Sequence, residues 1–322
     1  MTTAQAPGVV DILFERLDFT PLPTQELVLR CGKRFAQVTG GEQSGKSFTA
    51  AKWLITHIPY DQAKNEGSST GLLYWLVASD YDGTRREFEY IVDDLTSLFG
   101  PSRVTASKRV DPGVIEVKGK TPGYSIRIET KSANDPRKLR MQAPHGIIVC
   151  EASQVDFDTF NRCMGRTAPK RGWLFMSGTF EEGSIGWYPQ VWAAWKGGMD
   201  DRQSFSMPST ENTYFYAGGE NDPEILRLKN DSSDNWFLER IMGVPVPPRG
   251  LVIPEFRPDI HIQEVDYVPG EPVYLAVDPG YGHAYAVEAF QVIDGQVRGF
   301  DEIYEQGLIT SEVIDICQAR SW

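Results

Sequence analysis

The chain has 322 residues, of which 41% are hydrophobic and 24% charged, and its formal net charge is -12 at pH 7. This composition indicates a globular protein with a substantial core, and it excludes a surface that binds polyanions everywhere, so any nucleic-acid contact needs a local basic patch. The four cysteines form no C-x-x-C pair, and we find no signal peptide and no apolar stretch near the ~20 residues of a membrane span, so neither a zinc ribbon nor a membrane partner is expected.

Strand-like and helix-like segments alternate along the first two thirds of the chain, which predicts an α/β fold with a central, mostly parallel sheet. Helices are expected at 47–58 and 84–98. Strands are expected at 35–39, 71–78, 146–150 and 173–177, with a hairpin formed by 114–118 and 124–130 around Pro122-Gly123.

The remaining third divides by composition. Residues 200–244 carry nine acidic and four basic side chains, with helical spacing of apolar positions, and we expect a small helical lid there. The proline-rich stretch 243–250 resists helix and sheet and marks a linker. After the linker we expect three strands, at 273–280, 285–293 and 297–305, and then a helix that begins near Thr310. The predicted domains are 1–199 (core), 200–244 (lid), 245–270 (linker) and 271–322, the last expected to be incomplete.

The strongest motif follows the first predicted strand and matches G-x-x-x-x-G-K-[ST], a phosphate-binding loop. Its glycines let backbone N–H groups curl around phosphates, and the helix that follows adds its partial positive charge. Lys46 is expected to reach the β- and γ-phosphates of ATP, and Ser47 to bind Mg²⁺. The loop consists of Gly40, Gly41, Glu42, Gln43, Ser44, Gly45, Lys46 and Ser47.

A second candidate is Glu151, a carboxylate that ends the apolar run 146–150. In P-loop NTPases such a strand lies beside the P-loop strand, and its terminal acid can polarise the attacking water. Cys150 stands where the usual aspartate would bind magnesium. The segment 71–78 falls between the two motifs, an arrangement more typical of motor ATPases than of nucleotide kinases. The alternative is a buried strand that ends in an incidental acid.

Two further motifs complete a resemblance to the large terminase of tailed phages, the genome-packaging motor, over nearly the whole chain. Leu22-Pro23-Thr24-Gln25 resembles the family's adenine-reading motif, in which the amide of Gln25 would donate to and accept from the base. The tripeptide Ser177-Gly178-Thr179, after the strand 173–177, resembles the coupling motif that senses the γ-phosphate. The resemblance implies a P-loop NTPase core, a helical lid and an ATP-hydrolysing motor.

The resemblance also implies an arginine finger that acts on a neighbouring subunit. Arg140 is the first candidate and Arg137 the second, with Arg162 and Arg166 behind them. The chain departs from the family at Cys150 and in the P-loop, whose variable positions contain no arginine.

The C-terminal part resembles the start of the terminase nuclease, an RNase H-like fold. Asp278 matches an aspartate that binds the catalytic Mg²⁺ or Mn²⁺, and Glu302 a second acidic position. The other metal carboxylates are expected beyond Trp322, so we do not expect this chain to cleave DNA.

The resemblance further implies that the protein translocates double-stranded DNA and assembles as a ring, a pentamer, on the portal protein. It also implies contact with the small terminase subunit and a location in the host cytoplasm, at the procapsid vertex. A monomer in isolation is compatible with this. Residues 136–171 hold seven Lys or Arg and three acidic residues, a modest basic patch for DNA phosphates. The rival interpretations are a DNA helicase or recombination ATPase, a P-loop kinase of a small substrate, and a non-enzymatic, nucleotide-gated assembly subunit.

Overall fold

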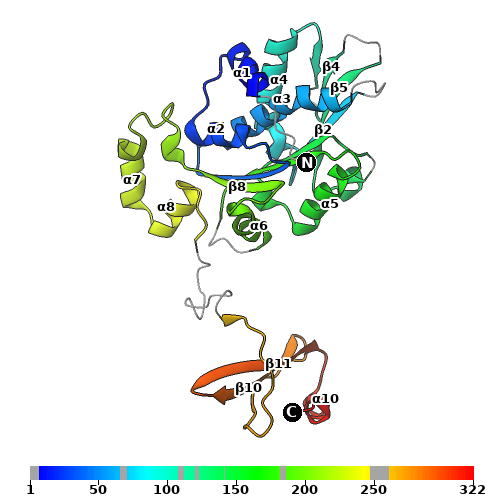
Figure 1. Cartoon of the computed structure of the whole chain (residues 1–322), viewed down its shortest axis with the longest axis vertical. Coiled ribbons are helices and arrows are strands. Elements are labelled where there is room, and N and C mark those ends of the chain that lie inside the picture. The colour runs from blue at the N-terminus through cyan, green and yellow to red at the C-terminus, as the bar shows by residue number, and fades with distance from the viewer. Residues whose placement is uncertain are drawn as a thin grey trace. The chain divides into compact units, whose positions relative to one another are not determined.

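The computed structural model divides the chain into two compact units, Met1–Leu251 and Val252–Trp322, and the division falls inside the expected linker 245–270 (Figure 1). No helix among the described residues is both long and apolar enough to cross a membrane. The structure describes residues 7–65, 71–107, 112–119, 123–140, 142–181, 186–246 and 261–322.

An eight-stranded sheet forms the centre of the first unit, in the order β3-β4-β5-β2-β6-β7-β1-β8. The strands from β5 to β8 in this order are parallel, and β3 and β4 extend one edge in antiparallel pairs. The strands are β1 (Phe35–Gly40), β2 (Leu72–Ala78), β3 (Val104–Ala106), β4 (Val114–Lys118), β5 (Ser125–Ser132), β6 (Gly146–Val149), β7 (Trp173–Gly178) and β8 (Arg202–Met207).

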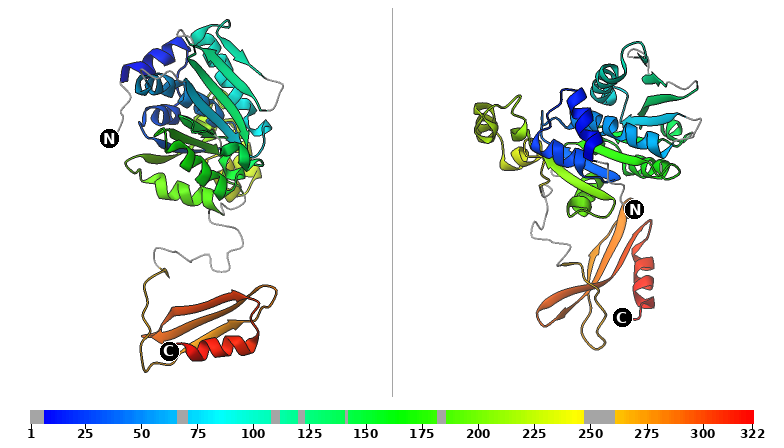
Figure 2. Two further views of the ribbon diagram at one scale, coloured as in Figure 1. Left: turned by 90° about the vertical axis from the view of Figure 1, so that its right-hand side faces the viewer. Right: turned by 45° about the horizontal axis from the view of Figure 1, so that its top comes forward.

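Helices cover both faces of this sheet (Figures 1 and 2). Alternate side chains of β2 show why its run is continuously apolar: Tyr74 packs with α3 and α4, whereas Trp75 belongs to the core on the α5 and α6 side. The mostly parallel α/β sheet expected from the sequence is therefore confirmed. The helices are α1 (Pro7–Arg16), α2 (Pro23–Arg30), α3 (Lys46–Lys64), α4 (Arg85–Phe99), α5 (Phe157–Thr167), α6 (Trp187–Lys196), α7 (Pro223–Asp231) and α8 (Asp234–Arg240).

The segment expected to begin the lid is a strand of the core sheet instead. Residues Arg202–Met207 form β8, which pairs with β1 in parallel from Phe35↔Arg202 to Gly40↔Met207. Its sequence, RQSFSM, lacks an apolar run because β8 is an edge strand with only two buried positions. The helices expected near residues 225–228 and 236–242 are present as α7 and α8, beside β8 in Figure 1.

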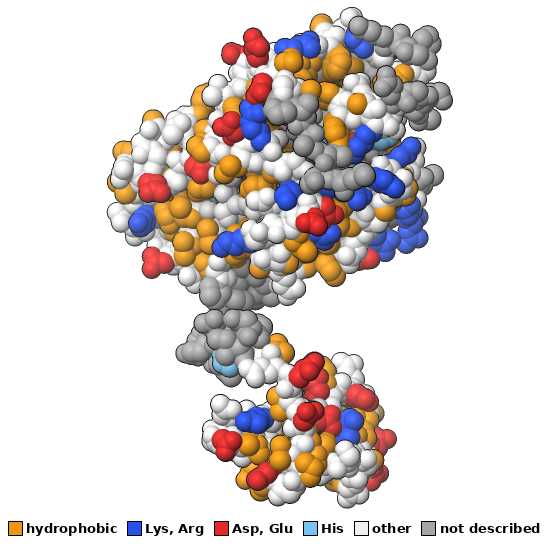
Figure 3. Space-filling model, viewed as in Figure 1, with side chains coloured by type: hydrophobic (Ala, Val, Ile, Leu, Met, Phe, Trp, Pro, Cys, Tyr) orange, Lys and Arg blue, Asp and Glu red, His pale blue; other side chains and the backbone are white. Residues whose placement is uncertain are grey.

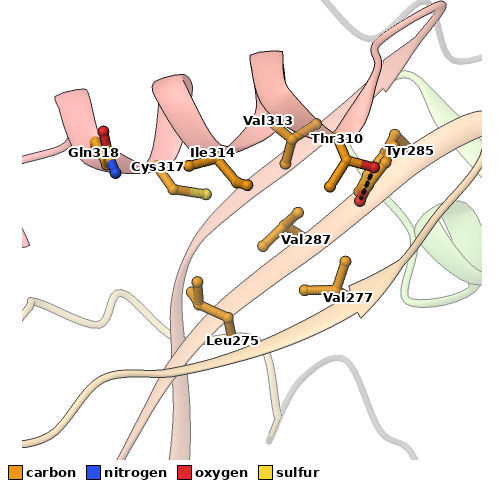
Figure 4. A pocket seen from close by; sticks show the side chains of 9 residues that line it. All are labelled: Leu275, Val277, Tyr285, Val287, Thr310, Val313, Ile314, Cys317 and Gln318. Carbon is orange, nitrogen blue, oxygen red and sulfur yellow. Dashed lines mark hydrogen bonds between the residues drawn. The ribbon is translucent and has the colours of Figure 1, made fainter.

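The second unit contains a three-stranded antiparallel sheet in the order β11-β10-β9 and one packed helix, as the pattern predicts. Tyr285, Val287, Ile303 and Val313 form its small core. Figure 4 shows the apolar pocket that remains between this helix and the strands, where Val277 is half exposed. The elements are β9 (Tyr274–Asp278), β10 (Ala284–Ile293), β11 (Gln296–Gln306) and α10 (Thr310–Ala319).

Candidate nucleotide-binding and catalytic site

The P-loop links the end of β1 at Gly40 to the start of α3 at Lys46. Gly45 has φ 91°, a left-handed conformation that glycine adopts without strain. A Cβ atom on Gly40 would lie 2.4 Å from Ser44 Oγ, so a side chain there would displace the Ser44 hydroxyl. The first-turn amides of α3 have no carbonyl partner within the helix, and among the described residues the buried Ser44 hydroxyl has none either. The loop thus presents unsatisfied donors, as a phosphate site requires.

The outer side of the loop is held by the end of α8. The Glu42 amide donates to the Arg240 carbonyl oxygen at 2.7 Å. A Cβ atom on Gly41 would lie 2.2 Å from the Ile241 carbonyl oxygen, so the contact needs glycine. The Arg240 guanidinium lies 3.5 Å from the Glu181 carboxylate and 3.9 Å from that of Glu42. The loop is therefore tied to a segment some 200 residues later in the chain.

The segment after β8 adds a second set of contacts to the same loop. The Ser209 hydroxyl donates to the Glu42 carbonyl oxygen, and the Asn212 amide donates to the Gln43 carbonyl oxygen at 2.6 Å. Gln43 has φ 57°, which these contacts hold in place. Sequence reasoning missed both partners, because a serine and an asparagine in a polar loop carry no motif.

Glu151 follows β6 and has φ 44°, a conformation that is costly for a residue with a side chain. The expectation that its strand lies beside the P-loop strand is wrong, because β7 pairs with both β1 and β6 and separates them. The segment 71–78 does not separate them either, since β2 lies on the far side of β6. The intervening strand typical of motor ATPases is present, and it is β7.

The coupling-motif candidate lies between the P-loop strand and the Glu151 turn. Ser177 aligns with Val38 of β1, and its buried hydroxyl has no hydrogen-bond partner within the described part of the chain. A Cβ atom on Gly178 would lie 3.2 Å from the Ala152 amide nitrogen, directly after Glu151. Thr179 is also buried. The structure thus brings Ser177-Gly178-Thr179 between the P-loop strand and the strand that carries Glu151.

A buried carboxylate that sequence reasoning missed, Glu87, completes this edge of the sheet. It lies in the first turn of α4, is 2% exposed, and has the side chains of Ser47 and Cys150 beside its carboxylate, where both act to lower its pKa. Burial raises the pKa of Glu87, and the charge of Glu151 contributes in the same direction. Because β2 lies beside β6, the helix that follows β2 meets the residue that follows β6. The available signal was an acid four residues before Ile91 on the apolar face of a helix.

The oxygen donors at this edge fit magnesium, whereas the thiol does not. Burial raises the pKa of Cys150 well above its usual range, and the charges of Glu87 and Glu151 add to the effect, so the thiol stays protonated. Magnesium takes oxygen ligands and few protein groups when a nucleotide supplies phosphates. Ser47 remains the residue that would bind it directly.

Gln25 lies against the P-loop, where the adenine-motif interpretation needs it. It is 3% exposed, and a Cβ atom on Gly45 would lie 3.1 Å from its Nε2. Its Oε1 accepts from the Leu22 amide at 2.9 Å. The side chain is therefore held at its oxygen, and its role toward adenine stays a prediction.

The candidate arginine fingers differ in whether a carboxylate pairs with the guanidinium. Arg137 pairs with Asp135 at 3.2 Å, and Arg162 pairs with Asp158. Arg140 is exposed directly after the 3₁₀ helix Pro136–Leu139, and none of the ion pairs between described residues involves it. Basic side chains gather on the face shown in Figure 3 near α5. An exposed, unpaired guanidinium is what a finger acting on a neighbour requires.

In the second unit, Asp278 and Glu302 share the sheet face opposite α10. Asp278 pairs with Ala286, and Glu302 pairs with Glu288, so alternation places all three acids on one face. Glu288 is the member of this face that sequence reasoning missed. The described residues contain no group of three or more His, Cys, Asp or Glu arranged to hold a metal ion. The metal role of Asp278 and Glu302 stays a prediction.

A P-loop on a parallel sheet, with an intervening strand before an acid-terminated one, defines the P-loop NTPase fold. The solved structures that resemble this chain include phage large terminases. One is the large terminase ATPase domain of Thermus phage P74-26. The match covers 73% of this chain and 98% of the ATPase-domain chain, at 19% identity and a TM-score of 0.58. The HK97 bacteriophage large terminase matches 99% of this chain and 71% of its own at 13% identity and a TM-score of 0.57.

A third similar structure is the large terminase of a thermophilic bacteriophage in complex with ADP. The match covers 92% of this chain and 73% of the terminase chain, at 11% identity and a TM-score of 0.52. No protein-family model and no curated protein sequence matches the chain. The resemblance to large terminases is thereby confirmed at the level of the fold.

Proposed function

We propose that this chain is the ATPase of a phage DNA-packaging motor, a large terminase that translocates double-stranded DNA. The observation that carries the proposal is the gathering of the P-loop, Ser177-Gly178-Thr179 and Glu151 at one edge of the sheet, with β7 between the two catalytic strands. The fold shared with phage large terminases supports it, as does the ADP bound in one of those neighbours.

In this mechanism the α3 amides and Lys46 bind the β- and γ-phosphates. Ser47 would bind magnesium, which would supply positive charge to the phosphates. Glu151 orients the attacking water and accepts its proton. Glu151 lies just after β6, which ends at Val149, and this places it at this edge of the sheet. Arg140 of a neighbouring subunit contributes charge that the P-loop, which contains no arginine, does not provide.

Coupling to movement follows from the contacts of the loop. The loss of the γ-phosphate changes the surroundings of Ser177, whose motif packs on the turn that carries Glu151. The loss of the γ-phosphate also changes the surroundings of Glu42 and Gln43 in the P-loop. These residues are hydrogen-bonded to Arg240 and Asn212, respectively. We infer that α7 and α8 act as the lid that converts hydrolysis into displacement.

The remaining assignments belong to the same proposal. The partners are double-stranded DNA, the portal protein and the small terminase subunit, with assembly into a ring at the procapsid vertex in the host cytoplasm. DNA phosphates would meet the basic patch within 136–171. The second unit is proposed to belong to a nuclease that uses Mg²⁺ or Mn²⁺ through Asp278 and Glu302.

Phosphate release with and without double-stranded DNA tests this proposal. A packaging motor hydrolyses ATP, and DNA raises its rate. Strand separation of a duplex would favour the helicase, and phosphorylation of an added small acceptor would favour the kinase. Binding of ATP without any hydrolysis, over a wide range of protein concentration, would favour the assembly subunit and refute the motor.

A further inference from the structure

Glu87 is a buried carboxylate that no part of the proposed mechanism uses. Burial of an acid without a cation is costly, and none of the ion pairs among the described residues includes Glu87. The other buried acid of α4, Asp94, is matched by Lys52 at 2.5 Å. The side chains beside Glu87 are instead the Ser47 hydroxyl and the Cys150 thiol, both at the catalytic edge.

Two unpartnered hydroxyls at the same edge indicate that a ligand is needed there. Ser44 in the P-loop is 0% exposed and Ser177 at the end of β7 is 1% exposed, and neither side-chain oxygen has a hydrogen-bond partner within the described residues. Buried polar atoms are normally satisfied, so unsatisfied ones around a phosphate loop point to groups that arrive with a nucleotide. The cation that Glu87 lacks can arrive in the same way, as the magnesium of the nucleotide.

We propose that Glu87 replaces the strand-terminal aspartate that is missing at Cys150, and that it positions Ser47 for the magnesium of a bound nucleotide. This inference rests on the proposed nucleotide-binding function. A Ser47 hydroxyl that donates to the adjacent Glu87 carboxylate would keep its oxygen lone pairs free for a metal. Glu87 also places a negative charge beside the cation. It is a positioning residue, since Ser47 is the group that binds.

The thiol of Cys150 fits this arrangement better than an aspartate would. Its protonated thiol lies beside Glu87 on the side of β6. An aspartate at the same place would set a second carboxylate against Glu87, and two close carboxylates cannot both ionise without cost. One acid at this edge can therefore stand on α4 or at the end of β6, but not at both places.

The experiment measures the affinity of the whole chain for fluorescent ADP in EDTA and in Mg²⁺, together with Mn²⁺ binding to the ADP complex by electron paramagnetic resonance. ADP excludes hydrolysis from the readout. The variants are Glu87→Gln, Cys150→Asp and the double variant. Glu89→Gln is the matched control, because it removes the same charge from an exposed position of the same helix.

Glu87→Gln should keep the affinity for ADP in EDTA and weaken Mn²⁺ binding by about 10- to 100-fold, the usual effect of losing a group that orients a metal ligand. The double variant should recover most of this loss, and Glu89→Gln should change nothing. Cys150→Asp alone should not tighten Mn²⁺ binding.

Three results would overturn the inference. One is unchanged metal dependence in folded Glu87→Gln. Another is an equal loss of ADP affinity with and without metal, which would make Glu87 a structural acid of the first turn of α4. The third, which does not need Glu87→Gln to fold, is a tenfold tightening in Cys150→Asp. Absence of ADP binding by the unmodified chain would instead refute the proposed function.

Discussion

Asp61 in α3 should make the first unit less stable as the pH rises, and Asp61→Asn should remove that dependence. The carboxylate is 4% exposed and accepts from the Tyr74 hydroxyl at 2.8 Å and the Trp173 indole at 3.0 Å. Burial raises its pKa from 3.8 to about 6. A folded-state pKa above the unfolded value means stability that is fully present below pH 3.8 and is lost as the pH rises through about 6.

The size of the effect follows from the two pKa values. Their difference corresponds to about 3 kcal/mol at pH 7 and above. Urea unfolding followed by tryptophan fluorescence, at intervals from pH 4 to 8, should show the free energy of unfolding of the unmodified chain falling relative to Asp61→Asn by about 2.5 kcal/mol, because a small part of the loss is already complete at pH 4. The change with pH is compared, because an asparagine adds a constant cost of its own. Asp93→Asn, at an exposed site of α4, is the control. Parallel pH curves for the unmodified chain and Asp61→Asn would refute the reasoning.

The remaining predictions concern catalysis. Glu151→Gln should bind ATP and lose about 10²- to 10⁴-fold in hydrolysis rate; loss of binding instead would make Glu151 a structural or metal residue. Arg140→Ala should lose roughly 10³-fold, and mixing it with Lys46→Ala should restore part of the activity under assembling conditions; no recovery, with assembly confirmed by light scattering, would place Arg140 outside a trans role. Gly178→Ala should slow hydrolysis by displacing the Glu151 turn, because its Cβ would lie 3.2 Å from the Ala152 amide nitrogen of that turn and 2.8 Å from the Tyr188 hydroxyl on its other side. Tyr188→Phe should restore part of the rate by making room; a normal rate in Gly178→Ala would contradict the coupling geometry.

The features that the sequence predicted are those encoded locally. Three motifs each consist of consecutive residues, so they can be recognised without knowing which distant segments they contact. They are the P-loop, the apolar run before Glu151 and the Ser177-Gly178-Thr179 turn. The strands of the parallel sheet are equally local, because burial on both faces makes them continuously apolar. These elements are present within a residue or two of the expected bounds, and α3 continues six residues further, to Lys64.

The features that were missed depend on contacts between distant segments. The strand order, with β7 rather than β2 next to β1, is set by pairing that no single segment encodes. The strand β8 was assigned to the lid because an edge strand carries polar residues. Glu87 lies 63 positions from Cys150, and only the pairing of β2 with β6 brings the two together.

The contacts on the outside of the P-loop also have a consequence for the order in which the protein can fold on the ribosome. The loop is synthesised near residue 40, yet its partners at Arg240 and Gly243 leave the ribosome about 200 residues later. Until then the Glu42 amide and the Thr39 hydroxyl lack these carbonyl acceptors. A nascent or recombinant fragment that ends before Gly243 would therefore carry the whole phosphate-binding motif with the supports of its outer side missing. The shortest useful nucleotide-binding fragment must extend through that glycine.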